Sequence, residues 1–206
     1  MRKYINIGIV YDSAHERTGE HATQLGYLLA QKGHKIHMIS LGHPLQSYPA
    51  PHNLFYHEAK VNNYYVFGSP PYELALSGKI IQVSRDLQLD LIHVHFAAPH
   101  VISAYLAKQI IGVNFHVVTT LKAEDIDILA TSGINKDLIR LALTASDVLT
   151  AESNHLISET TQLLQIPCDN IHLIPGFVHL PVSFFNERIL EKYEDIYYRI
   201  LDRTGP

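Results

Sequence analysis

Short apolar runs alternate with segments of helical hydrophobic spacing along the chain, and this alternation limits the fold more than any other feature. A buried strand gives a short, nearly continuous apolar run, whereas a surface helix repeats its apolar residues every three or four positions. Runs of the first kind occupy residues 4–11, 35–40, 53–59, 89–94, 116–121, 147–151 and 171–174. Helical spacing separates most of them, which predicts a single doubly wound α/β domain with a parallel sheet covered on both faces.

An amphipathic segment follows the loop at residues 175–181. From Asn186 onward, apolar side chains recur at helical spacing, at Ile189, Tyr193, Ile196 and Ile200. Such a stripe is too apolar to remain in water, so the helix is expected to pack back on the α/β domain. Further helices are predicted at about residues 73–87, 99–111, 137–143 and 153–164.

Composition narrows the possible partners and compartment. The 206 residues carry 16 Lys and Arg against 20 Asp and Glu, so no basic surplus favours nucleic acid. No apolar run reaches the roughly 18 residues of a membrane span, and the N-terminus lacks the long apolar segment of a signal peptide. The single Cys168 excludes an internal disulfide, which favours the cytoplasm. The 14 histidines are scattered, and we interpret them as surface residues rather than a pH sensor.

Ligands of such sheets bind at the carboxyl ends of the strands, so the residues that follow each strand are the first candidates for a site. One of these ends carries His93 and His95, with His100 shortly after. Three histidines can bind zinc, but the spacing is weakly specific and no carboxylate is near in sequence. We therefore predict no metal, and we expect His95 to make a polar ligand contact.

The next two strand ends leave their interpretation open. Thr119, Thr120, Lys122 and Asp125 lie within seven residues, and their groups can bind a carboxylate or sugar hydroxyls or can begin a solvated helix. Ser153 or Asn154 follows the sixth strand, where helix capping explains either residue without a ligand. Neither segment holds a recognisable cofactor motif or catalytic residue, and Cys168 has no nearby histidine arranged as a base.

The segment after the first strand is interpreted as an ordinary polar loop. A phosphate cradle at this position needs glycines, so that backbone N–H groups approach the anion closely. Residues 16–19 read Glu-Arg-Thr-Gly, which leaves only Gly19 and places Glu16 where an anion would sit.

Several segments resemble one group of family-4 retaining glycosyltransferases, those that make N-acetylglucosaminyl malate in the first step of bacillithiol synthesis. The resemblance lies in residues 61–67 (VNNYYVF), 70–76 (PPYELAL), 91–100 (LIHVHFAAPH) and 118–121 (VTTL), among others. It extends over nearly all of residues 4–180.

The resemblance implies a domain organisation. Enzymes of this group have two Rossmann-like domains: the first binds the acceptor, L-malate, and the second binds the nucleotide sugar, UDP-N-acetylglucosamine. Residues 1–181 resemble the first domain, no segment resembles the donor domain, and residues 182–206 resemble the helix that ends the full-length enzymes. The chain therefore resembles an internal deletion that keeps the acceptor domain and the closing helix.

The sequence differs from this group of enzymes at two motifs, both of which face the donor sugar nucleotide in the group. The Gly-Gly-Ser-Gly loop after the first strand is replaced by Glu16, Arg17, Thr18 and Gly19. The His-Gly-Thr-Asp motif after the fifth strand becomes Lys122, Ala123, Glu124 and Asp125. We therefore expect no tight binding of UDP-N-acetylglucosamine, and we assign no catalytic residue.

By the same resemblance, a small carboxylate such as L-malate is the expected ligand. The expected acceptor-side residues are His95, Thr119, Thr120, Lys122, Asp125, Arg140, Ser153 and Asn154. Three hypotheses stay open: an incomplete glycosyltransferase, a non-catalytic module for carboxylate binding or partner docking, and the acceptor half of a two-chain enzyme. A face without its donor domain can also form a homodimer, and charges such as Lys122 and Glu124 are expected to keep that face soluble.

Overall fold

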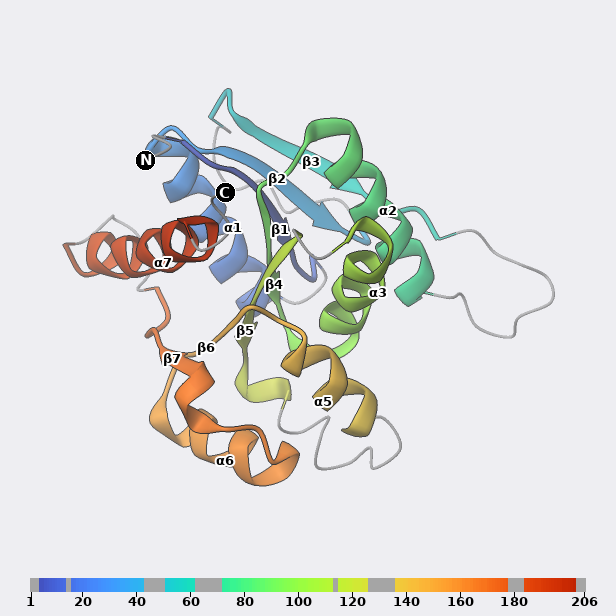
Figure 1. Cartoon of the computed structure of the whole chain (residues 1–206). Helices are drawn as coiled ribbons and strands as arrows, with labels where there is room; N and C mark the ends of the chain where they lie inside the picture. The colour runs from blue at the N-terminus through green and yellow to red at the C-terminus, as the bar shows by residue number, and fades with distance from the viewer. Residues whose placement is uncertain are drawn as a thin grey trace.

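A seven-stranded parallel sheet in the order β3-β2-β1-β4-β5-β6-β7 forms the centre of the molecule (Figure 1). The computed structural model describes residues 4–13, 16–42, 51–61, 72–112, 115–125, 136–177 and 184–202. The strands are β1 (Asn6–Val10), β2 (Lys35–Ser40), β3 (Leu54–Glu58), β4 (Leu91–His95), β5 (His116–Leu121), β6 (Val148–Ala151) and β7 (Ile171–Leu173). The strand order reverses direction beside β1, as the predicted doubly wound fold requires.

The helices follow the predicted segments closely. They are α1 (Glu16–Gln31), α2 (Tyr72–Leu87), α3 (Ile102–Ile111), α5 (Lys136–Thr144), α6 (Asn154–Leu164) and α7 (Phe184–Asp202). A π-helical turn, η1 (Ala97–Val101), precedes α3, and α7 begins two residues before the predicted Asn186. Among the described residues, no helix is long and apolar enough to cross a membrane.

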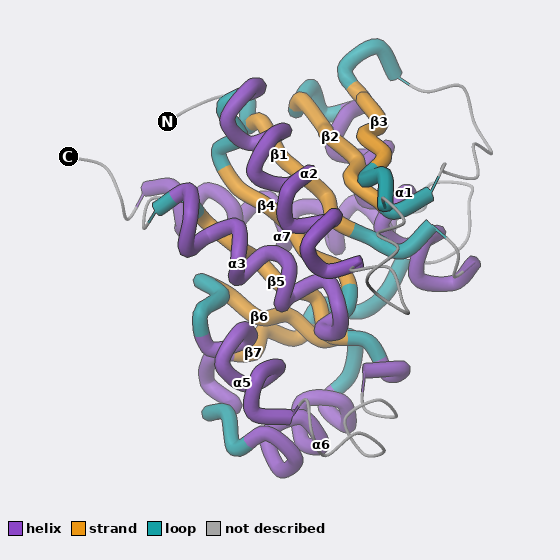
Figure 2. Tube along the Cα trace, turned by 90° about the vertical axis from the view of Figure 1, so that its right-hand side faces the viewer, coloured by secondary structure: helices purple, strands orange, loops and turns teal. Residues whose placement is uncertain are grey.

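Helices cover both faces of the sheet. On one face, α1 and α7 pack on β1 through a core that includes Leu25, Leu29 and Ile189. On the other face, α2 and α3 contribute Leu76 and Ala104, and Figure 2 shows these two helices in front of the strands. A third apolar cluster joins α5 and α6 to β5, β6 and β7. These three clusters explain why the strands are apolar on both sides.

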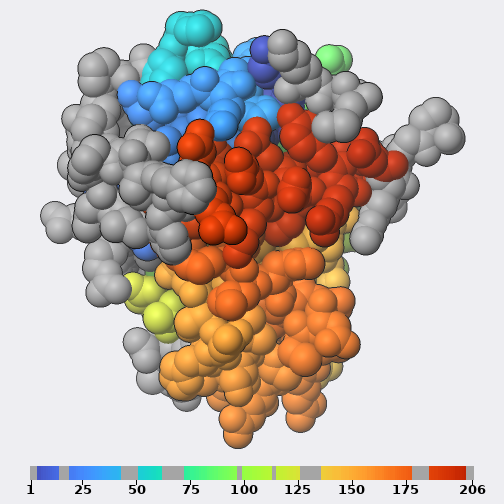
Figure 3. Space-filling model, turned by 90° about the vertical axis from the view of Figure 1, so that its left-hand side faces the viewer, coloured from blue at the N-terminus to red at the C-terminus, as the bar shows by residue number. Residues whose placement is uncertain are grey.

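The closing helix α7 lies across the sheet, as the apolar stripe predicts (Figure 3). Ile189, Leu190, Tyr193, Ile196, Tyr197 and Ile200 are all buried. Polar contacts fix the helix as well: Lys32 Nζ lies 3.6 Å from Glu187 Oε1, and His34 Nε2 lies 2.8 Å from Glu194 Oε1. Because His34 Nδ1 accepts the Ile5 N–H at 3.1 Å, the imidazole proton is on Nε2 and is donated to Glu194.

The interpretation of the histidines as surface residues is wrong for a large share of them. His34, His37, His93, His95, His100 and His116 are buried. Four of these six belong to strands β2, β4 and β5, and a sheet that is covered on both faces buries side chains of either parity. The scattered positions of the histidines in the sequence therefore do not indicate whether their side chains are exposed.

The packing of α7 leads to a first prediction. Removal of residues 182–206 exposes the apolar face that α7 covers, and burial of each large apolar side chain contributes about 1.5–3 kcal/mol as an upper estimate. We expect the melting temperature to fall by at least about 10 °C in thermal unfolding followed by circular dichroism. Lys192→Ala changes an exposed residue of the same helix and is the matched control. An unchanged melting curve for the shortened chain would contradict the stabilising role of α7.

Candidate functional site

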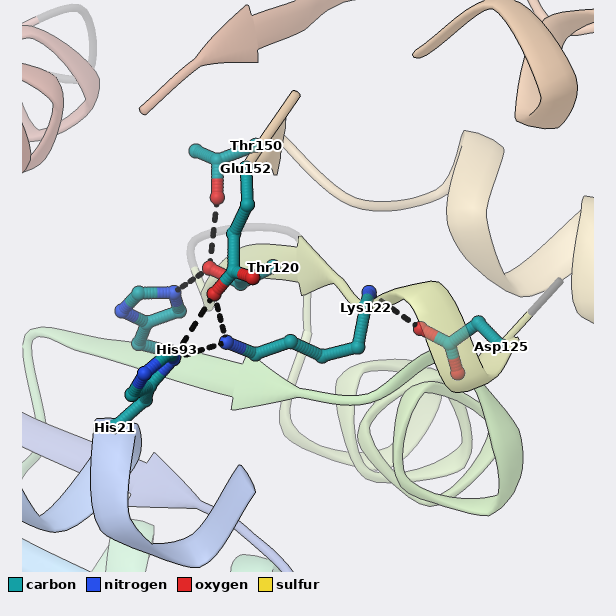
Figure 4. Close-up of polar contacts among 7 residues, drawn as sticks. All are labelled: His21, His93, Thr120, Lys122, Asp125, Thr150 and Glu152. Atoms are coloured by element: carbon teal, nitrogen blue, oxygen red, sulfur yellow. Dashed lines mark hydrogen bonds and ion pairs between the residues drawn. The ribbon is translucent and has the colours of Figure 1, made fainter. Parts of the chain in front are cut away.

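The carboxyl ends of β4, β5 and β6 bring polar side chains together on the face that α1 and α7 cover (Figure 4). The backbone register aligns His95 with Thr120 and Thr120 with Thr150. Side chains two residues apart in a strand point to the same face of the sheet, so Lys122 lies on the face of Thr120, and Glu152 lies on the face of Thr150. The site therefore has an inner row of side chains at the level of Thr120 and Thr150, and an outer row at the level of Lys122 and Glu152.

The inner row is a continuous chain of hydrogen bonds. The two ring nitrogens of His93 lie 2.6 Å from the Tyr197 hydroxyl and 2.6 Å from Thr120 Oγ1, which in turn lies 2.7 Å from Thr150 Oγ1. Burial, followed by the charge of Lys122, lowers the pKa of His93 to about 3, so the ring is neutral and has one donor and one acceptor. These hydrogen bonds link α7 to the three strands β4, β5 and β6.

The outer row is a charged cluster of Lys122, Glu152 and His21. Lys122 Nζ contacts Glu152 Oε1, and His21 Nδ1 lies 3.0 Å from each of these two atoms. The Lys122 side chain is only 3% exposed, whereas Glu152 and His21 are 29% and 30% exposed. Asp125 Oδ2 accepts the backbone N–H of Lys122 at 2.8 Å, which fixes the turn after β5.

The cluster is neutralised from within the chain. Burial alone would raise the pKa of Glu152, but the His21 hydrogen bond and the Lys122 charge outweigh it and lower that pKa to about 2. Glu152 is therefore ionised at every physiological pH. The positive charge of Lys122 is consequently already balanced by a carboxylate of the same chain.

His95 is buried beside this cluster. Its ring lies 4.4 Å from the His93 ring, and neither ring nitrogen has a hydrogen-bond partner among the residues that the structure describes. Burial lowers the pKa of His95, followed by the charge effects of His93, Lys122 and His21, so the ring is neutral. His100 does not complete a three-histidine group with His93 and His95, because His100 Nδ1 bonds to the His95 carbonyl oxygen at 2.9 Å. Within the described ranges, no three His, Cys, Asp or Glu residues are placed to hold a metal.

The expected acceptor-side residues divide into two sets. His95, Thr120, Lys122 and Asp125 gather at the strand ends. The other four residues are Thr119, Arg140, Ser153 and Asn154. Thr119 is wholly buried and lies 2.9 Å from Ser146 Oγ, and strand alternation turns it away from Thr120. Arg140 is exposed on α5, Ser153 caps α6 by accepting the Leu156 N–H at 3.1 Å, and Asn154 is exposed as the first residue of α6.

The segment Glu16, Arg17, Thr18 and Gly19 is helical, which corrects its interpretation as a loop. These residues begin α1, and the side chains of the first three lie outside the described part of the structure. A Cβ added at Gly19 would lie 2.8 Å from the Asp12 carbonyl oxygen, so the glycine lets α1 approach the end of β1.

Sequence reasoning missed Glu152, His21 and the pairing of His93 with Tyr197. Glu152 was detectable, because it follows a predicted strand and shares the parity of Thr150. His21 and Tyr197 come from helices whose placement over the strand ends no local pattern encodes. The expectation that Lys122 keeps a face soluble is wrong, because its ammonium is buried against Glu152.

Comparison with known proteins bears on this site. The family described as Glycosyltransferase Family 4 matches residues 18–181. The chain belongs to glycosyltransferase family 4. Within the family, it is 42% identical over 180 residues to N-acetyl-alpha-D-glucosaminyl L-malate synthase of Bacillus anthracis. The match covers 87% of this chain and 47% of that enzyme, so the chain spans about half the length of this curated relative.

Solved structures confirm the fold. Sucrose-phosphate synthase from Thermosynechococcus elongatus matches 84% of this family-4 chain at a TM-score of 0.57 and 13% identity, but only 48% of the synthase is covered. A second, shorter structure of that enzyme matches 94% of the chain at a TM-score of 0.61 and 16% identity, and 98% of that structure is covered. At these identities the likeness concerns the fold alone.

The charged pair of this family-4 chain predicts unequal effects of two substitutions. Glu152→Ala leaves a buried ammonium with no carboxylate and should lower the free energy of unfolding by about 3 kcal/mol. Lys122→Met leaves a carboxylate that water and His21 still reach, and should cost about 1 kcal/mol. Urea unfolding of both variants measures the difference. Equal losses, or a larger loss for Lys122→Met, would contradict the burial of the charge on Lys122.

The neutral His93 predicts a stability that depends on pH. In the unfolded chain a histidine has a pKa near 6.5, whereas folded His93 has a pKa of about 3. Below pH 6.5 the unfolded state therefore binds a proton that the native state does not, and stability falls as the pH falls. Between pH 7 and 4.5, we expect His93→Gln to remove about 2–3 kcal/mol of this loss in urea titrations. His155→Gln, at an exposed histidine, is the control and should retain the full dependence.

Proposed function

We propose that this chain is a glycosyltransferase-like acceptor domain that does not by itself transfer N-acetylglucosamine to L-malate. The observation that carries the proposal is the contact of Lys122 with Glu152 and His21. It lies after β5, where the resemblance implies a histidine facing the donor sugar. A residue that is buried and paired within its own chain is not available to a nucleotide sugar.

The matched lengths define the residues to which this proposal applies. The chain covers about half of its curated relative, and it matches nearly all of the shorter sucrose-phosphate synthase structure. We accordingly divide the chain into an acceptor domain at residues 1–181 and a closing segment at 182–206, most of which is α7. The packing of α7 on the β1 face supports treating the two parts as one folded unit.

The chemistry of glycosyl transfer gives the physical reason. The nucleotide diphosphate must be held while its bond to the sugar breaks, and positioning of this kind supplies roughly 7–11 kcal/mol. The strand ends present an ionised carboxylate, Glu152, and the nearby ammonium of Lys122 is already neutralised by it. A diphosphate leaving group at these strand ends would therefore gain little electrostatic stabilisation. We further propose a cytoplasmic location, which suits the exposed free Cys168.

An activity assay tests the proposal directly. Purified chain is incubated with L-malate and UDP-N-acetylglucosamine, and N-acetylglucosaminyl malate is measured by chromatography. The expected result is no product above the blank, under conditions in which the Bacillus anthracis enzyme, the positive control, forms it. The combined variant Glu16→Gly, Arg17→Gly and Lys122→His should be equally inactive, because motif residues on an acceptor domain do not by themselves hold a nucleotide sugar. Product above the blank, from protein free of full-length enzyme, would overturn the proposal.

A further inference from the structure

The ammonium of Lys122 is a buried charge that needs a counter-ion. Its side chain is 3% exposed, and an unpaired charge at such a position is strongly destabilising. The carboxylate of Asp125 is engaged by the Lys122 backbone N–H at 2.8 Å. The ion pair that the structure records for the ammonium is with the carboxylate of Glu152, and His21 Nδ1 lies 3.0 Å away.

We propose that Lys122 and His21 form a binding position for a small carboxylate anion, and that the side-chain carboxylate of Glu152 fills it as a resident occupant. The inference deepens the proposed function, because it identifies what closes the strand ends of this acceptor domain. In Figure 4 the Glu152 side chain reaches from the end of β6 to the Lys122 ammonium, with His21 of α1 on the other side.

The difference in exposure between Glu152 and Lys122 supports a carboxylate that can be exchanged. Glu152 and His21 are 29% and 30% exposed, whereas Lys122 is almost fully buried. The carboxylate therefore lies between the ammonium and the solvent, as a ligand that enters from outside would. The cation stays on the deeper side of the pair.

The backbone opposite the pair leaves room for this group. A Cβ added at Gly176 would lie 3.0 Å from His21 Cε1 and 3.3 Å from Glu152 Oε1. Contacts of 3.0–3.4 Å are tighter than side chains normally tolerate, so the glycine just after β7 keeps open the space that the carboxylate occupies. This observation is independent of the charges.

The inner wall of the position also has unused polar capacity. Both ring nitrogens of His95 are buried and lack a hydrogen-bond partner among the described residues. The charges of Lys122 and His21 are close enough to lower the pKa of His95, after the larger effect of burial. A neutral imidazole offers one donor and one acceptor, so polar groups could be accommodated on this side.

The occupant is expected to exclude free anions from the intact protein. A tethered carboxylate acts at an effective concentration in the millimolar range or above, so a weakly bound anion in solution does not displace it. Protonation does not release it either, because Lys122 and His21 keep the pKa of Glu152 at about 2 despite burial, which acts to raise it. Removal of the Glu152 side chain is therefore the way to open the position.

Acetate is the matched probe, because Glu152→Ala deletes a group of the same size and charge. Thermal unfolding of the full chain is followed over a series of sodium acetate concentrations, against sodium chloride at equal ionic strength. At ten times its Kd, acetate should raise the melting temperature of Glu152→Ala by about 3–6 °C, in a saturable manner. The wild-type chain should shift by less than about 1 °C over the same series.

Two further variants keep the test decisive. Lys122→Met combined with Glu152→Ala removes the cation as well, and should show no acetate response beyond that of chloride. Glu152→Ser is a second background that opens the same space with a small polar residue, and should respond as Glu152→Ala does. The proposal is overturned if neither single variant responds, if both fail to fold at every acetate concentration, or if the double variant responds equally. The readout is stability, so a failure of the proposed function in the transfer assay would not be confused with a failure here.

Discussion

The packing of α7 across the sheet is the constraint on which the rest of this structure depends. Its apolar residues cover the β1 face, and Tyr197 reaches through that core to His93 at 2.6 Å. The helix both buries the imidazole of His93 and supplies one of its two hydrogen bonds, and a group left unsatisfied at such a buried position would cost about 1–3 kcal/mol. The hydrogen bonds from Tyr197 through His93 to Thr120 also link α7 to β4 and β5.

The pairing of Lys122 with Glu152 at the strand ends is a consequence of the same burial. Once α1 and α7 exclude water from this face, an ammonium at the tip of β5 needs a partner within reach, and Glu152 at the tip of β6 provides it. Open α/β sheets bind their ligands at the carboxyl ends of the strands. In this chain the buried ammonium of Lys122 is already engaged by Glu152, and this contact is the basis of our proposal that the domain does not transfer the sugar by itself.

Local pattern predicted the fold well because each element satisfies its own hydrophobic period. The strand β5 (His116–Leu121) was predicted with its observed bounds, and α2 differs from its predicted start by one residue. Errors arose where two periods meet: η1 is a π-helical turn instead of the start of α3, and residues 16–19 are helical instead of a loop. At residue 19 a Cβ would lie 2.8 Å from the Asp12 carbonyl oxygen, so the glycine permits the helix to begin close to the end of β1.

The sequence by itself determined the doubly wound sheet, the closing helix and the polar residues at the ends of β4 and β5, because all three follow from spacing along one segment. Only the tertiary structure decided which of those residues meet. Lys122 went into the interior instead of the surface, and its partners came from residues 21 and 152. Such contacts depend on the register of neighbouring strands and on where a helix crosses them, and neither quantity is encoded within a single segment.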